Sequence, residues 1–163
     1  MLHVALVIKL LVLLSIANGA PVLIKKLCGN RFSRPIDGGC NFFDERPLFG
    51  RSKTIRGVLV SVVAAAAGAP LLGLSVTIGA VVGSAAMAGD LFSSFVKRRL
   101  NLRPSSRATG LDQIPESLFP LLACRGWLSL TVLDTLIGVA AFLIGEILLS
   151  RIFFRFGVRD QPY

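Results

Sequence analysis

Three polar side chains in one apolar stretch of this chain have the types and the spacing of a chemical site. Asp90, Ser94 and Lys97 lie in GAVVGSAAMAGDLFSSFVKRRL, and positions i, i+4 and i+7 face the same side of a helix. An ionisable group inside a membrane helix is costly and usually faces a cavity or a partner. This stripe of a carboxylate, a hydroxyl and an amine predicts a polar site near the end of the helix. A plain ion pair with a loop arginine is the structural alternative.

A second stretch, FGRSKTIRG, has the composition of a phosphate-binding loop. Gly50 and Gly57 allow backbone N–H groups to approach a phosphate closely, while Lys53 and Arg56 supply positive charge for its oxygens. Thr54 adds a hydroxyl. The stretch is not a Walker A loop, because the first glycine and the G-K-T order are missing. These residues predict phosphate binding without naming the compound that carries the phosphate.

Three further acids accompany these stretches. Asp37 and Asp44 precede the loop, and Asp112 opens an apolar segment in GLDQIPES; taken singly, they are ordinary turn or helix-cap residues. Together with Asp90 they bring four carboxylates to the same predicted side of a membrane, beside many cations. Mg²⁺ takes carboxylate oxygens together with substrate phosphates and keeps several waters. We therefore expect a magnesium-dependent site that handles a nucleotide.

The elements that must position these groups are membrane helices. The chain has 163 residues, of which 53% are hydrophobic and 17% charged, against about 45–50% and about 25% in a soluble domain. Its mean hydropathy of +0.72 favours an all-α, polytopic membrane bundle that forms a single domain, 1–163. The net charge of +9 does not indicate a nucleic-acid partner, because nothing resembles a recognition helix or an RNA-binding sheet.

Five spans are expected. The first is an apolar run that we interpret as uncleaved, because its positive charges follow it rather than precede it. The next uncharged run is too long for one helix to cross a bilayer and contains GAPLLG, whose glycines and proline end helices. The predicted spans are 2–24, 55–72, 75–97 and two within 113–150 that turn near 124–127, with a single span at 128–150 as the alternative.

The basic residues orient these spans. Of the 18 lysines and arginines, all but Lys9 and Arg125 then fall in the loops 25–56 and 97–112 or in the C-terminal tail. Positive charge marks the cytoplasmic side of a membrane protein. We therefore predict an N-terminus outside, a cytoplasmic C-terminus and an active-site mouth formed by these two loops.

Other features have structural interpretations. The pair Gly79 and Gly83 allows two helices to approach closely. The three cysteines form no C-x-x-C pair and no Cys/His cluster, so zinc and a disulfide framework are not expected. His3 has no evident partner in the sequence. The cysteines expected to be free are Cys28, Cys40 and Cys124.

Two acids lie inside the last apolar section. Asp134 and Glu146 are expected to pair with Arg125 and Arg151. Acids within spans can also relay protons or ions, so a small transporter or a non-catalytic assembly protein is the alternative function. A transporter should concentrate its polar residues near the midplane, whereas the dense polar blocks of this chain lie towards one face.

Taken together, the polar blocks resemble those of the CDP-archaeol synthase family, which belongs with the phosphatidate cytidylyltransferases. The resemblance is carried by DGG…FFDERPLFGRSKTIRG, GDLFSSFVKRRL and GLDQIPES, in this order, over residues 35–120. It implies a multi-pass enzyme of the cell (inner) membrane that transfers a cytidylyl group from CTP to a lipid phosphate, with Mg²⁺ as cofactor. The implied partners are CTP, the lipid phosphate and membrane lipids, and a homodimer is compatible with it.

The resemblance also implies a role for each matching residue. Asp90 and Asp112 match the metal-binding acids, and Lys97 is expected to act with them in catalysis. Asp37 and Asp44 match acids of the first cytoplasmic loop whose role the resemblance leaves open. The positions expected to contact nucleotide or lipid phosphate are Lys53, Thr54, Arg56, Ser94, Lys97 and Arg98.

The chain departs from the family pattern at three points. It has ATGLDQ where the bacterial type has His-Gly-Gly before the final acid, Pro115 followed by Glu116 where the archaeal type tends to have a second Asp, and DER for a more usual Asp-Gly-Arg turn. The metal and phosphate positions are kept. Both an isoprenoid-ether lipid phosphate and a diacylglycerol phosphate fit the sequence.

Overall fold

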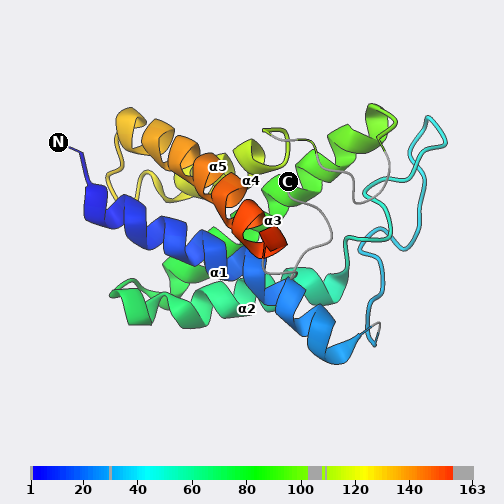
Figure 1. Ribbon diagram of the computed structural model, residues 1–163, viewed down its shortest axis with the longest axis horizontal. Helices are drawn as coiled ribbons and strands as arrows, with labels where there is room; N and C mark the ends of the chain where they lie inside the picture. The colour runs from blue at the N-terminus through cyan, green and yellow to red at the C-terminus, as the bar shows by residue number, and fades with distance from the viewer. Residues whose placement is uncertain (1, 30, 103–107, 109, 156–163) are drawn as a thin grey trace.

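The fold is a bundle of helices (Figure 1). The computed structural model describes residues 2–29, 31–102, 108 and 110–155, with 149–155 described by their backbone alone. Within these residues there is no strand, only two isolated bridges, Pro35 with Thr54 and Asn41 with Pro47. The all-α prediction is confirmed. The elements are α1 (Val4–Cys28), α2 (Ile55–Gly68), the short 3₁₀-helix η1 (Pro70–Leu72), α3 (Val76–Arg99), α4 (Gln113–Cys124) and α5 (Val132–Arg155).

Three segments of the described chain are long and apolar enough to cross a membrane. They are α1 with 25 residues, α2 continued through η1 with 18 residues, and α3 with 24 residues. A span needs about 20 apolar residues. The three segments match the first three predicted spans to within four residues at each end, and the membrane-bundle prediction is confirmed.

The break between α2 and α3 falls in GAPLLG, as predicted. Pro70 opens η1, where its missing N–H costs no helical hydrogen bond. Gly73 then adopts a left-handed conformation with φ 70°, which a glycine reaches without strain. The side chain of Ser75 accepts a hydrogen bond from the Ile78 N–H and so caps α3. This compact turn makes α2 and α3 antiparallel neighbours.

Small residues let α2 and α3 touch backbone to backbone. A Cβ added to Gly79 would lie 2.4 Å from the Ala65 carbonyl oxygen, and one added to Gly83 would lie 2.8 Å from the Val62 Cα. Neither position has room for a side chain, so the interpretation of this glycine pair as a packing surface is confirmed. The core around it consists of Leu10, Leu13, Leu14, Ala17, Ala65, Ala69, Val82, Ala86, Leu121, Cys124, Leu130 and Phe142.

The last apolar section contains a short helix and a long one. The chain turns over residues 125–131, as expected, and α5 returns along the bundle with 24 residues. Helix α4 has only 12 residues, about 18 Å, which is shorter than a hydrocarbon core of about 30 Å. Helix α4 packs closely on α3, because a Cβ at Gly89 would lie 2.2 Å from the Pro115 carbonyl oxygen.

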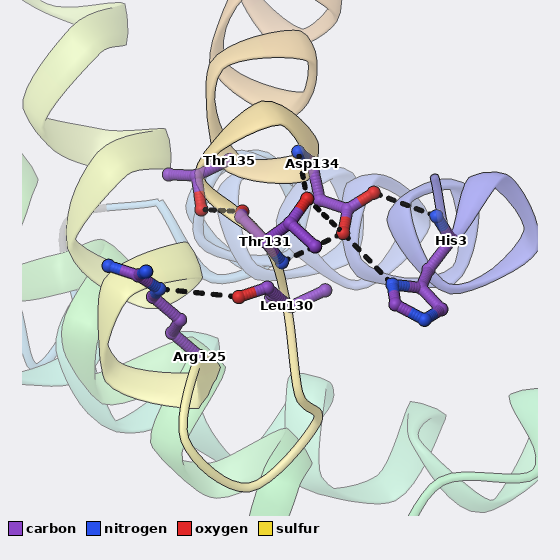
Figure 2. Close-up of polar contacts among 6 residues, drawn as sticks. All are labelled: His3, Arg125, Leu130, Thr131, Asp134 and Thr135. Atoms are coloured by element: carbon purple, nitrogen blue, oxygen red, sulfur yellow. Dashed lines mark hydrogen bonds and ion pairs between the residues drawn. The ribbon is translucent and has the colours of Figure 1, made fainter. Parts of the chain in front are cut away.

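The start of α5 is joined to the start of α1 (Figure 2). The Asp134 carboxylate, fully buried, accepts hydrogen bonds from the His3 N–H at 2.8 Å and lies 2.9 Å from the His3 Nδ1. It also accepts from the Thr131 N–H at 2.8 Å, which caps α5. The predicted pairing with Arg125 is wrong, because the Arg125 Nε donates to the Leu130 carbonyl at 3.2 Å within its own turn.

Two smaller predictions have different outcomes. The three cysteines are free, as expected. The expected pairing of Glu146 involves the Arg151 side chain, which lies outside the described part of the structure.

The two polar loops meet at one end of the bundle. The α1–α2 loop (cyan in Figure 1) lies at the end of α3 opposite the chain's N-terminus. Ion pairs join it to α3, from Lys53 to Asp90 and from Arg99 to Asp44, while Lys97 of α3 pairs with Asp112 at the start of α4. The predicted active-site mouth thus has its parts together, and its cytoplasmic orientation stays a prediction.

Candidate functional site

Asp37 organises the α1–α2 loop through its own backbone. Its carboxylate accepts hydrogen bonds from the Gly39 N–H at 2.9 Å and from the Phe49 and Gly50 N–H groups, both at 3.0 Å. Burial alone would raise the pKa of the Asp37 carboxyl, but these three donors stabilise its charged form and hold the pKa below its ordinary value. Asp37 therefore fixes the turn that leads into the basic stretch containing Lys53.

Asp44 ties the outer part of the same loop to α3. Its Oδ1 lies 2.5 Å from the Arg99 Nη1. The Arg99 guanidinium also stacks at 4.9 Å from the ring centroids of Phe42 and Phe95, and its Nη2 donates to the Pro47 carbonyl at 2.7 Å. The two acids whose roles the sequence left open thus shape the loop, Asp37 at its base and Asp44 at its tip.

Lys53 and Asp90 form the central contact of the candidate site. The Lys53 Nζ lies 2.6 Å from Asp90 Oδ1 and 2.5 Å from Asp90 Oδ2, with about a quarter of each side chain exposed (22% and 26%). The Lys53 N–H donates to the Gly50 carbonyl at 3.1 Å, which links its position to the turn held by Asp37. The structure brings together the residues predicted from the two separate stretches, and the partner of Asp90 is a lysine rather than a loop arginine.

This pair lies in the wall of a cavity of about 920 Å³. The cavity is bounded by α1, the basic stretch, the start of α2, and α3, with one acid each from α4 and α5. Its charged or polar lining residues are Ser15, Asn18, Lys25, Lys26, Ser33, Arg51, Ser52, Lys53, Thr54, Arg56, Asp90, Glu116 and Glu146. The size suits a nucleotide or a lipid headgroup, and the cations outnumber the acids, which favours an anionic ligand.

Thr54 and Arg56 line this cavity while holding local structure. The Thr54 hydroxyl caps α2 by accepting from the Gly57 N–H at 3.1 Å. The Arg56 guanidinium donates to the carbonyl oxygens of Arg31 and Gly29 across the loop. Both predicted phosphate-binding residues therefore start from fixed positions at the cavity wall.

A second cluster surrounds Lys97 and Asp112 at the junction of α3 and α4. The Lys97 Nζ lies 2.7 Å from Asp112 Oδ1. Lys97 and Arg98 are 8% and 6% exposed, and Ser94 is 3% exposed, so all three are buried in α3. None of these residues, nor Asp112, lines the 920 Å³ cavity. The structure therefore divides the predicted site into the cavity around Lys53 and Asp90 and this adjoining buried cluster.

Two cavity acids were missed by the sequence interpretation. Glu116 was noted only as a departure from a family pattern, and Glu146 was assigned a structural partner. In the structure both line the cavity, and the charges that act on the Glu116 carboxyl come from Asp90, Glu146, Lys53 and Asp112. A signal for each was present, because Glu116 lies four residues after Asp112 on a helix and Glu146 interrupts an apolar span.

The carboxylates do not form a closed metal cage. Within the described residues no group of three or more His, Cys, Asp or Glu side chains could hold a metal ion. Asp90 and Asp112 are each paired with a lysine. A magnesium ion in a phosphate-handling site commonly takes only one or two protein carboxylates, the rest coming from water and substrate phosphates. The cavity acids suit that manner of binding.

Comparison with known proteins gives the family. A family model described as CarS-like, CDP-archaeol synthase, matches residues 3–163. The chain belongs to the CDP-archaeol synthase family. The CDP-archaeol synthase of Sulfurisphaera tokodaii is 32% identical over 154 residues, which cover 91% of this chain and 89% of that protein. That of Hyperthermus butylicus is 39% identical over 105 residues, which cover 60% of this chain and 59% of that protein.

A solved structure has a similar arrangement of helices. It is of an intramembrane enzyme for archaeal membrane lipids biosynthesis, is 30% identical to this chain, and gives a TM-score of 0.75 over 88% of this chain and 91% of its own. The family resemblance predicted from the sequence is confirmed. Membership of the CDP-archaeol synthase family identifies the chain as a membrane-associated enzyme of the CTP-using lipid cytidylyltransferase class.

Proposed function

We propose that this protein transfers the cytidylyl group of CTP to a membrane lipid phosphate and releases pyrophosphate. An oxygen of the lipid phosphate attacks the α-phosphorus of CTP, a new P–O bond forms, and the bond between the α-phosphorus and the bridging oxygen breaks. The observation that carries the proposal is the Lys53–Asp90 pair in the wall of a 920 Å³ cavity that is rich in cations. Phosphoryl chemistry of this kind needs positioning and charge neutralisation more than covalent participation by the protein.

The cations of the cavity wall bind the triphosphate. Lys53 and Arg56 come from the basic stretch, while Lys25 and Lys26 come from the last turn of α1. When CTP binds, the Lys53 amine keeps its contact with one oxygen of Asp90 and exchanges the other oxygen for a phosphate oxygen. The charges of Lys53 and Asp90 therefore both stay paired. Thr54, at the start of α2, contributes its hydroxyl and an orientation fixed by the helix cap.

Magnesium is the proposed cofactor, and the donor set on the cavity wall fits it. Asp90 would hold the ion with Glu116 beside it on the cavity wall, and Asp112, the second predicted metal acid, belongs to the adjoining buried cluster. When bound, Mg²⁺ neutralises phosphate oxygens and stabilises the charge of the transition state. The protein's own part is to keep hard carboxylate oxygens next to a lysine that can move to the phosphate.

The buried cluster on α3 is proposed to act from behind this wall. Lys97 is expected to take part in catalysis, with Arg98 and Ser94 near the nucleotide or lipid phosphate. What supports this is that the Lys97 charge is held in place by Asp112 at 2.7 Å, so little side-chain entropy is lost when a phosphate approaches.

The substrate lipid and the membrane are part of the proposal. The apolar chains lie between the helices while the phosphate meets CTP at the cytoplasmic mouth of the cell membrane. Both an isoprenoid-ether glycerol phosphate and a diacylglycerol phosphate are candidates, and the names of the relatives favour the ether lipid. A homodimer stays a prediction.

The test is transfer of label from CTP to lipid by the purified protein. With Mg²⁺ and an isoprenoid-ether glycerol phosphate, labelled CDP-lipid and pyrophosphate should form in equal amounts, and a parallel diacyl substrate gives the preference. The variant Asp90→Asn should lose nearly all turnover. Glu45→Gln, which removes an exposed acid outside the cavity, is the matched control and should keep it. Full activity of Asp90→Asn would show that the assignment of Asp90 is wrong.

A further inference from the structure

The main cavity contains an amide without a hydrogen-bond partner. Both polar atoms of the Asn18 side chain are buried and, among the residues described, bonded to nothing, although Asn18 lines the 920 Å³ cavity. Leaving a buried amide unpaired is unfavourable, and nearly all such groups in folded proteins have partners. Asn18 lies in LLVLLSIANGAPVLI, a part of α1 whose only other polar side chain is Ser15. Both amide atoms are shielded from solvent, so the side chain gains a partner in the cavity only by turning toward a ligand that binds there.

Helix α1 presents one continuous stripe to this ligand. Ser15, Gly19, Val22 and Lys26 line the main cavity at intervals of three or four residues, and Asn18 lies beside Gly19 and four residues before Val22, so they share one helix face. The stripe is basic at the end near the loop and uncharged at the other end, where Ser15 and Gly19 also border an apolar groove. Asn18 lies close to the change from one character to the other.

The apolar part of the stripe forms a second hollow that joins the first. A groove of about 500 Å³ runs along α1, and it shares Ser15, Gly19 and Leu23 with the main cavity. From Ile8 to Leu23 it follows α1 for about 22 Å. Its lining residues are Ile8, Leu11, Val12, Ser15, Ile16, Gly19, Ala20 and Leu23.

A lipid phosphate matches this sequence of surfaces. Its phosphate would lie by the cations near Lys53, and its hydrocarbon chains would follow the groove on α1, which continues the polar cavity without a break. Between phosphate and chains a glycerol lipid carries ether or ester oxygens, which accept hydrogen bonds. The NH₂ group of an asparagine donates two, and its oxygen can accept from water that accompanies the headgroup.

We propose that Asn18 is a specificity-determining residue that donates to a glycerol oxygen of the lipid phosphate, while the α1 groove holds a hydrocarbon chain. The inference rests on the proposed cytidylyl transfer and adds the part of the substrate that is recognised. The site selects glycerol-based lipid phosphates over alkyl phosphates of the same chain length, because an alkyl phosphate leaves the amide unpaired.

The test compares Asn18→Leu with the wild type on two lipids. The variant should raise the KM for a glycerol lipid phosphate about tenfold, the usual effect of losing one buried hydrogen bond, and leave the KM for CTP within about twofold. The inhibition constant of an alkyl phosphate of the same chain length should change less than twofold. Asn18→Gln, which keeps the amide, should recover part of the lost affinity. Thr77→Val, a polar-to-apolar change on α3 outside both hollows, is the control.

Melting temperature separates recognition from a purely structural role. Without lipid, Asn18→Leu should melt at or above the wild-type temperature, because the change removes an unpaired buried amide. Addition of the glycerol lipid phosphate should raise the melting temperature of the wild type more than that of the variant. An unchanged KM for that lipid, or an equal loss of affinity for the alkyl phosphate, overturns the role of Asn18. A wild-type protein that transfers no cytidylyl group to any lipid phosphate overturns the proposed function instead.

Discussion

Replacing Lys53 by methionine removes the cation that neutralises Asp90, and the cost can be worked out from their geometry. At 2.5 Å and an effective dielectric of about 20, the gross attraction is about 6–7 kcal/mol. The two side chains keep 22% and 26% of their surface exposed, so water screens the pair, and desolvation and side-chain entropy offset most of the attraction. We expect a net coupling of about 1–3 kcal/mol.

A double-mutant cycle measures this coupling. The unfolding free energies of wild type, Lys53→Met, Asp90→Asn and the double variant are compared in the same detergent micelles. Each single change leaves one member of the pair unmatched, so the double variant should be more stable than the sum of the two single losses predicts. Lys9→Met, a change at the other end of α1, is the control for removing a lysine.

The same variants report on catalysis in a different way. Lys53→Met loses one of the cations proposed to bind phosphate, so its kcat/KM should fall about 10²–10³-fold. The double variant should regain stability but not kcat/KM, because it still lacks that phosphate contact. Additive unfolding energies would refute the ion pair as a stabilising contact. A Lys53→Met enzyme within about threefold of wild-type kcat/KM would refute the role of Lys53 in binding the triphosphate.

Three further predictions concern the scaffold around the site. Asp37→Asn should lower the melting temperature at neutral pH. Because folding lowers the pKa of Asp37 from 3.8, the extra stability of the wild type over the variant is complete above that value and is lost as the pH falls below it. Melting curves of both proteins between pH 7 and pH 3 would show this. Gly89→Leu should abolish folding and activity, because even a Cβ at this position would lie 2.2 Å from the Pro115 carbonyl oxygen. The control Gly126→Ala, whose added Cβ would have nothing within 4 Å, should give wild-type amounts of protein in detergent extracts. Asp134→Asn should lower the melting temperature by weakening its contacts to His3 while the KM for CTP stays the same, and a large change in that KM would contradict the structural role.

The helices and their meeting point were largely predictable from the sequence. Long apolar runs with few charges and the GAPLLG break define the first three spans, because a bilayer fixes the length and polarity that a span needs. The contact between the loop and α3 followed from placing Lys53 and Asp90 on the same side of the membrane. No pattern in the sequence gives which of several cations pairs with which acid, because that choice depends on how the loop packs against α3.

The failures have physical causes as well. Arg125 and Asp134 are near in sequence, but a backbone carbonyl within the turn takes the arginine, and the aspartate caps its own helix and bonds His3, more than a hundred residues away. Glu116 and Glu146 reach the cavity from α4 and α5, two helices that follow the predicted loops and pack back onto the bundle. Such long-range pairings depend on packing, which hydropathy does not encode.

The His3–Asp134 contact limits how the bundle can open. It fastens α1 to α5 at the end of the bundle opposite the α1–α2 loop (Figures 1 and 2), while Lys26 of α1 and Glu146 of α5 line the cavity further along. Two rods joined at one end can separate only by rotation about the joint. For a helix of about 36 Å, a rotation of about 5° moves the free end by about 3 Å. In the proposed reaction, a lipid entering sideways between α1 and α5 therefore finds its widest opening beside the cations of the cavity wall, and its narrowest beside His3.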